Sequence, residues 1–128
     1  MGIFLGRNSE LKFVALPGRE SANPFSSFDL PTSANVSLRI VNLSFDPNRN
    51  SHVHPRSVEV SYVSKGAGTL WIAGERFRIE EGDSFLIPLG IAHATIPDQG
   101  TPMQLICFFP VSDFATNIEE IAGRVLDK

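Results

Sequence analysis

The segment SHVHPRSVEV, residues Ser51–Val60, decides how the rest of the chain is interpreted. It contains His52 and His54, two of the three histidines in the chain, and Glu59 follows five positions after the second. On an extended strand His52 and His54 project from the same face, because successive side chains alternate between the two faces. Two imidazoles and a carboxylate on one face form a ligand set that suits a first-row divalent metal.

The third histidine, His93, completes this candidate site. If the segments carrying His54 and Glu59 pair as a hairpin, Glu59 returns to the side of the histidines. His93 follows a turn at Pro88 and Gly90, so a strand that begins there can face the hairpin across a barrel. The prediction is a site of three imidazole nitrogens and one carboxylate, with open positions for water, substrate or dioxygen.

Length and composition indicate one ordinary globular domain. Of 128 residues, 42% are hydrophobic and 20% are charged, so we expect a single domain over residues 1–128. The net charge is −3 and the basic residues form no run, so neither nucleic acid nor an anionic membrane surface is an expected partner. No apolar run approaches the roughly 20 residues that a membrane-spanning helix needs.

The N-terminal segment and the single cysteine favour a cytoplasmic location. The first residues, MGIFLGRNSELKF, lack the basic start, the long apolar stretch and the cleavage site of a secretory signal peptide. Cys107 has no second cysteine with which to form an internal disulfide. Its apolar neighbours, MQLICFF, favour a buried structural thiol, and a reducing compartment suits it.

The middle of the chain, about residues 35–110, has the pattern of a β-barrel core. Residues 35–45 alternate Val36, Leu38 and Ile40 against Ser37, Arg39 and Val41, and residues 57–64 alternate as well. A turn at residues 73–75 predicts a hairpin, and residues 102–110 form an apolar run of strand-forming residues between two prolines. Strands at this spacing without helical crossovers predict an all-β sandwich or barrel.

The two ends of the chain have different patterns. Residues 1–34 are less regular and rich in turn formers, so we expect an N-terminal arm that is mostly loop. Residues 113–126 are predicted to form a short helix, because Phe114, Ile118, Ile121 and Val125 fall on one helical face. Thr116 and Glu119 have the spacing of a helix capping box.

Two motifs in this sequence resemble those of the cupins, a superfamily of small β-barrels. The first cupin motif is matched by His52, one residue, His54, four residues, Glu59, six residues and Gly66. The second is matched by Gly82, five residues, Pro88, one residue, Gly90, two residues and His93. The sequence departs from the family at Asp46, where a glycine is frequent, and at Pro97, where an asparagine is usual. The resemblance covers about residues 35–109.

The resemblance implies a single double-stranded β-helix, or jelly-roll barrel, that binds one divalent transition metal per chain: Mn, Fe, Ni, Co or Zn. His52, His54, Glu59 and His93 are then the metal ligands; a histidine pair on a strand is otherwise more often a surface or hydrogen-bonded pair. Metal-dependent cupins include dioxygenases, decarboxylases and isomerases or cyclases, so we expect an enzyme of one of these types. The alternative is a non-catalytic module that binds or senses a metal or a small ligand.

If the metal takes every histidine, the catalytic group is the metal centre itself, and no other catalytic residue is identified. Arg39 interrupts an apolar strand and is a candidate anchor for a substrate carboxylate if it points inward. The alternative is that it shares the face of Ser37, outside the core. The expected partner is a small organic molecule.

A homodimer is also expected. Val58, Val60 and Tyr62 have the parity opposite to that of Glu59, so they form an apolar face outside the barrel, which Trp71 is expected to join. Such a face needs a cover, either a second copy of the chain or the N-terminal arm.

Overall fold

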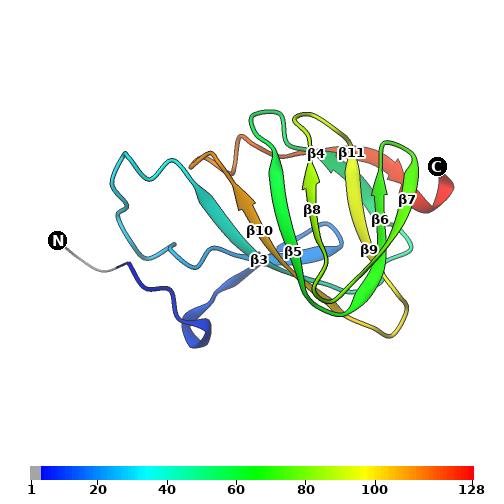
Figure 1. The fold of residues 1–128 in the computed structure, drawn as a ribbon, viewed down its shortest axis with the longest axis horizontal. Coiled ribbons are helices and arrows are strands. Elements are labelled where there is room, and N and C mark those ends of the chain that lie inside the picture. The colour runs from blue at the N-terminus through cyan, green and yellow to red at the C-terminus, as the bar shows by residue number, and fades with distance from the viewer. Residues whose placement is uncertain (1–3) are drawn as a thin grey trace.

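The computed structural model describes residues 4–128 and confirms the expected all-β fold, with two antiparallel sheets facing each other (Figure 1). The six-stranded sheet has the order β1 (Phe13–Leu16), β2 (Arg19–Ala22), β3 (Ser37–Leu43), β10 (Met103–Phe109), β5 (Glu59–Lys65), β8 (Ser84–Ile87). The five-stranded sheet has the order β11 (Glu119–Arg124), β4 (Asn50–Val53), β9 (His93–Pro97), β6 (Ala67–Ile72), β7 (Glu75–Glu80).

The helical content of the described residues is limited to two short 3₁₀ turns, η1 (Asn8–Glu10) and η2 (Val125–Asp127). Within residues 4–128, no helix combines the length and the apolar character needed to cross a membrane.

The core between the sheets follows the alternation of the strands. On β10 the side chains of Met103, Leu105, Cys107 and Phe109 are buried, whereas Phe108 is exposed. This is the period-two pattern of a strand with one buried face. The expected burial of the single thiol is therefore confirmed.

The alternation in the sequence suggests that Leu38 and Ile40 face the core, but the structure buries the other face of β3. Val41 and Leu43 are buried in the core, whereas Leu38 is only partly buried. Ser37 lies on the same inward face, and its Oγ donates to the carbonyl oxygen of Val111 at 2.7 Å. Arg39 has this parity too, so the face that it shares with Ser37 is the interior face of the barrel.

The predicted hairpin is present between β6 and β7. Its two-residue turn consists of Ala73 and Gly74, with φ angles of 49° and 88°. Two successive positive φ angles are typical of the turn type that matches the twist of paired strands, and Gly74 adopts such an angle without the strain that a side chain adds.

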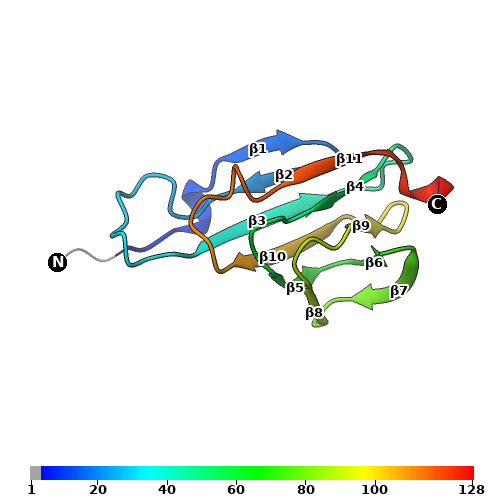
Figure 2. The same cartoon turned by 90° about the horizontal axis from the view of Figure 1, so that it is seen from above.

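The N-terminal arm contributes more than a loop. β1 and β2 form a hairpin around Pro17 and Gly18, and β2 pairs with β3, so the arm extends the six-stranded sheet (Figure 2). The burial pattern of β2 explains why its sequence did not predict a strand: Arg19 and Ser21 face the interior in place of apolar residues.

The predicted C-terminal helix over residues 113–126 is wrong. Residues Glu119–Arg124 form β11, which pairs with the edge of β4 (Figure 2). Gly123 has a φ angle of +106°, which a right-handed helix does not allow. The apolar residues that suggested one helical face instead serve different sites: Phe114 packs against the main core, and Val125 lies in a second cluster.

That second cluster contains Trp71, whose expected position was also wrong. Trp71 is buried with Ala94, Ile96 and Val125, which belong to β9 and the C-terminal 3₁₀ turn. It therefore packs under the C-terminal segment and does not extend the exposed face that carries Val60.

Replacing Gly123 with alanine distinguishes the strand from the helix. A Cβ at this position meets only the end of the Lys128 side chain, at 3.4 Å, so the cost arises from the backbone angle. We expect Gly123→Ala to lower the free energy of unfolding by about 1–3 kcal/mol, measured by urea denaturation. Stabilisation by about 1 kcal/mol, which an exposed helix predicts, would contradict the strand assignment.

Candidate metal centre

The four residues expected to bind a metal come together in the interior of the barrel, but by a different route from the one predicted. β4 and β5 belong to different sheets, so the expected hairpin between them does not form. His52 on β4 is the register partner of His93 on β9, and the two stand side by side in the five-stranded sheet. Glu59 is the first residue of β5 and faces them from the opposite sheet.

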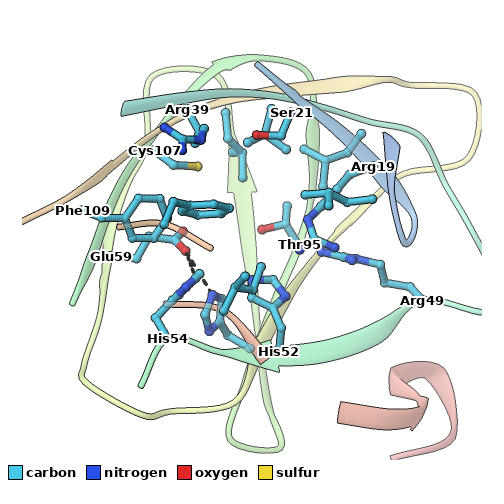
Figure 3. A pocket seen from close by; sticks show the side chains of 17 residues that line it. Arg19, Ser21, Arg39, Arg49, His52, His54, Glu59, Thr95, Cys107 and Phe109 are labelled. Carbon is cyan, nitrogen blue, oxygen red and sulfur yellow. Dashed lines mark hydrogen bonds and ion pairs between the residues drawn. The ribbon is translucent and has the colours of Figure 1, made fainter. Parts of the chain in front are cut away.

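The side chains of the cluster converge closely. One possible ligand atom from each of the four residues lies within 4.8 Å of the others, and their exposed fractions are between 2% and 6%. The Oε1 atom of Glu59 is 2.8 Å from Nε2 of His54 and 3.1 Å from Nε2 of His93 (Figure 3). The arrangement thus gathers three imidazoles around one carboxylate.

Backbone carbonyl groups fix the orientation of two imidazoles. Nδ1 of His54 lies 2.7 Å from the carbonyl oxygen of Asn117, and Nδ1 of His93 lies 2.9 Å from that of Ile91. A carbonyl oxygen only accepts, so each Nδ1 carries the hydrogen and donates it. In the neutral ring the lone pair is then on Nε2, the atom that points toward Glu59.

This geometry sets acceptor against acceptor unless a positive charge lies between them. A carboxylate oxygen and the bare Nε2 atoms of His54 and His93 all carry lone pairs, and at about 3 Å they repel each other. Protons on the imidazoles or a metal cation can remove this conflict. Histidine nitrogens oriented by outer hydrogen bonds are typical of metal ligands, so the residues fit a divalent ion.

Within the described chain, His52 lacks the orienting hydrogen bond at Nδ1 that His54 and His93 have. Its Nδ1 is buried and finds no hydrogen-bond partner among residues 4–128. Burial lowers the pKa of His52 well below its usual range, and the charges of His93 and Arg19 lower it further. The ring is therefore neutral, which is the state that a metal requires.

Glu59 remains ionised in the interior. Burial acts to raise its pKa, but the imidazoles of His54 and His93, in the state in which Nε2 carries a proton, outweigh this through hydrogen bonds and positive charge and bring the pKa well below its usual range. The second carboxylate oxygen accepts a hydrogen bond of 2.6 Å from Ser61 Oγ. A fixed negative charge therefore faces the imidazoles.

Asn117 supports the site, although sequence reasoning missed it. It is fully buried, and besides accepting from His54 it donates to Ser57 Oγ at 2.8 Å and accepts from the backbone N–H of Arg56 at 2.8 Å. These contacts tie the segment before β11 to the loop between β4 and β5. The residue is 63 positions from His54, so no local pattern indicates the contact.

A narrow pocket with a cavity volume of about 40 Å³ opens beside the cluster. Its walls are mainly apolar. They also carry three arginines from different segments of the chain, Arg19, Arg39 and Arg49 (Figure 3). The arginines suit a small ligand with an anionic group.

Arg39 faces this pocket, as the anchor interpretation requires, but its guanidinium already has neighbours. It stacks on the Phe114 ring at 4.5 Å from the centroid and donates to the carbonyl oxygen of Leu38 at 2.9 Å. Partial burial lowers its pKa.

Arg19 and Arg49 are pocket residues that sequence reasoning missed. Both donate from Nη1 to the carbonyl oxygen of Pro17 at 2.8 Å, and Arg19 also pairs with Glu120 at 3.0 Å. Burial lowers the pKa of Arg49 to about 10, with the charge of Arg19 adding to this effect. Arg49 precedes His52 by only three residues, and this proximity was the available indication that it lines the pocket. Arg19 gave no such indication, because it lies in an arm expected to be a loop.

Comparisons with known proteins agree with the fold. A curated relative, an uncharacterized protein of Methanocaldococcus jannaschii, is 30% identical over 71 residues, which is 54% of this chain and 57% of that protein. The match thus spans a little over half the length of that relative.

Solved structures with the same fold have low sequence identity. Pac13 of Streptomyces, described as a nucleoside dehydratase, is 12% identical with a TM-score of 0.72, over 94% of this chain and 92% of its own. KdgF of Halomonas is 22% identical with a TM-score of 0.68, over 90% and 99%. Oxalate decarboxylase of Lactobacillus farciminis, in a formate complex, is 19% identical with a TM-score of 0.69, over 88% of this chain and 34% of its own.

The family model described as "Cupin domain" matches residues 43–109, more than half of the chain and the part that contains all four clustered residues. The two-sheet architecture, the structural neighbours and this match agree, and the protein belongs to the cupin family.

Proposed function

We propose that His52, His54, Glu59 and His93 bind one divalent transition-metal ion per chain and that the protein is a metal-dependent enzyme. The observation that carries this proposal is the convergence of acceptor atoms: the Nε2 atoms of His54 and His93 point at Glu59 Oε1 while their Nδ1 atoms donate to carbonyl groups. A cation between these atoms satisfies all of them together. Mn, Fe, Ni, Co and Zn all suit three imidazoles and a carboxylate.

The substrate that fits the pocket is a compact oxygenated organic molecule. A divalent ion in this position supplies polarisation of a substrate oxygen, which suits dioxygenase, decarboxylase or isomerase and cyclase chemistry. Apolar residues such as Leu105 and Phe109 exclude water around the cluster. Arg39 faces the same space and is retained as a candidate substrate anchor.

The titratable groups of the pocket favour a reaction centred on the ion. Apart from the four clustered residues, the described lining contains three arginines and Cys107. Burial raises the pKa of the Cys107 thiol well above its usual range, so it is a poor nucleophile. Tyr62 is 45% exposed on the outside of the barrel. The absence of a further general acid or base from the described lining also agrees with the second candidate, a non-catalytic cytoplasmic module that senses a metal or small ligand.

Metal content tests the ligand assignment. Protein purified without chelator is expected to contain close to one divalent ion per chain by elemental analysis. His93→Ala and Glu59→Gln are expected to weaken binding by more than the roughly 10–100-fold that loss of an outer-shell partner costs. Acidification below about pH 6 is expected to release the ion, because imidazoles must be neutral to bind it.

Glu119→Gln provides the matched control, since it removes an exposed carboxylate from β11. It is expected to retain the wild-type metal content. Less than a tenth of an ion per chain after reconstitution of the wild type, or equal loss in the control, contradicts the assignment.

Turnover separates the enzyme from the sensing module. With Fe(II) or Mn(II) bound, the enzyme is expected to consume dioxygen, or to convert members of a panel of small hydroxy and oxo acids. Oxygen uptake and NMR of the panel measure the two outcomes. His93→Ala is expected to abolish turnover while leaving the circular dichroism spectrum unchanged. A metal-loaded protein that converts no compound with any metal supports the module instead.

We also propose that the protein forms a homodimer through the outer face of the six-stranded sheet. Leu38, Phe108, Val60 and Leu86 are successive cross-strand neighbours on β3, β10, β5 and β8. Three of them are exposed by 37–56%. The adjacent cross-strand row consists of Ile40, Ile106, Tyr62 and Ser84. Neither row carries a charge, so two copies can approach face to face without repulsion.

The oligomeric state tests this face. Wild-type protein is expected to have the mass of two chains in size-exclusion chromatography with light scattering. Val60→Glu introduces a charge into the centre of the face and is expected to give single chains. Phe77→Glu is the control, because Phe77 is 49% exposed on β7 of the other sheet. Monomeric wild type, or equal dissociation of both variants, contradicts the proposal.

A further inference from the structure

Arg49 is a buried cation without a partner of opposite charge. Only 3% of the residue is exposed, and the one hydrogen bond that its side chain makes among residues 4–128 runs from Nη1 to the carbonyl oxygen of Pro17. Its Nε has no partner in the described chain, and no carboxylate lies within ion-pair distance of it there. Buried guanidinium groups are normally paired, because removing an isolated charge from water is costly.

A second guanidinium lies beside it. Arg19 donates to the same Pro17 carbonyl oxygen, and its side chain is only 5% exposed. Glu120 pairs with Arg19 at 3.0 Å, whereas Glu120, Asp46 and Glu59 act on Arg49 only from beyond ion-pair distance. The two positive charges repel each other, so an additional negative charge in contact with Arg49 would stabilise the pair.

Both arginines line the pocket that contains the four clustered residues. Figure 3 shows the nitrogen-bearing end of Arg49 directed into this space, on the side of His52 and Thr95. The fold provides the arrangement from two sheets: Arg19 begins β2 of the N-terminal hairpin, and Arg49 directly precedes β4. A ligand in the pocket can therefore contact both the four clustered residues and the unpaired guanidinium of Arg49.

We propose that Arg49, supported by Arg19, binds a carboxylate group of the substrate, which identifies the substrate class as a small carboxylic acid. The inference rests on the proposed function in one respect, namely that the part of the substrate that does not contact Arg49 faces the four metal ligands. The planar guanidinium matches the two oxygens of a carboxylate, and a bidentate pair of this kind supplies both affinity and orientation.

Two alternatives fit less well. Arg39 lines the same pocket, but its guanidinium is stacked on Phe114 and bonded to a backbone carbonyl, and it is less buried. A phosphate has a larger and more strongly hydrated anionic group, which suits this mainly apolar space less than a carboxylate does.

Binding of malonate measured by isothermal titration calorimetry tests the proposal on the full chain, first free of metal and then loaded with Zn(II). Low ionic strength preserves the electrostatic contribution. Wild type is expected to bind malonate more tightly than the uncharged malonamide and more tightly than inorganic phosphate. Arg49→Met is expected to weaken malonate binding by about tenfold or more, and Arg19→Met by a smaller factor.

The melting temperature of the ligand-free protein separates a binding role of Arg49 from a structural role, because the two roles predict opposite effects of its replacement. Because Arg49 is unpaired, Arg49→Met is expected to leave the melting temperature unchanged or to raise it, while malonate no longer raises it further. A purely structural arginine would lower the melting temperature when replaced. Arg49→Lys, which keeps the charge but loses the planar fork, serves as the second variant and is expected to bind malonate more weakly than wild type.

A matched control and a competing variant complete the experiment. Arg78→Met removes an exposed arginine on β7 and is expected to bind malonate as wild type does. Arg39→Met removes a charge from the same pocket and compares the two candidate anchors: the proposal predicts a smaller loss of malonate binding than with Arg49→Met. Equal binding of malonate and malonamide, tighter binding of phosphate, or loss with Arg39→Met in place of Arg49→Met overturns the proposal.

The outcome is separable from that of the metal proposal. Malonate binding that depends on Arg49 in a protein that takes up no metal supports the carboxylate site and contradicts the metal centre. One bound Zn(II) per chain in a protein that ignores malonate contradicts the carboxylate site alone.

Discussion

Glu59 and the three histidines meet across the barrel, and this contact between the two sheets is the constraint on which the site depends. The carboxylate stands on one sheet and the imidazoles on or beside the other, so the site exists only when the two sheets face each other in the correct register. With Nδ1 of His54 and His93 committed to carbonyl groups, the opposed acceptor atoms need a positive charge between them. Folding thus assembles a position for a cation in a water-poor interior.

The segments outside the central strands support this position. The C-terminal segment, which forms β11, also supplies Asn117, and this residue fixes His54 and the loop between β4 and β5. The N-terminal hairpin supplies Arg19 and the Pro17 carbonyl group that orients Arg49. The negative charge of the buried carboxylate and the positive charges of Arg19 and Arg49 therefore come from different segments that line one pocket, which suits a ligand with unlike ends.

Much of this was predictable from local sequence. The spacing from His52 to Glu59, together with His93 after its turn, identified the four clustered residues, because strand parity and turn position are local properties. The C-terminal helix was predicted wrongly because its apolar spacing reflects contacts with separate parts of the core, and Gly123 adopts an angle that the pattern does not reveal. Pairing of β4 with β9 was also beyond local patterns, since strands that are distant in sequence compete for the same edges.

The most direct test of the metal centre is X-ray absorption spectroscopy of the Zn(II)-loaded protein. The account predicts a first shell of nitrogen and oxygen donors at about 2.0–2.2 Å, with outer-shell scattering from three imidazole rings and no sulfur. Replacement of His93 by alanine is expected to remove the contribution of one ring. A first shell with sulfur, or a spectrum of hydrated zinc without imidazole scattering, would contradict the assignment of His52, His54, Glu59 and His93 as ligands.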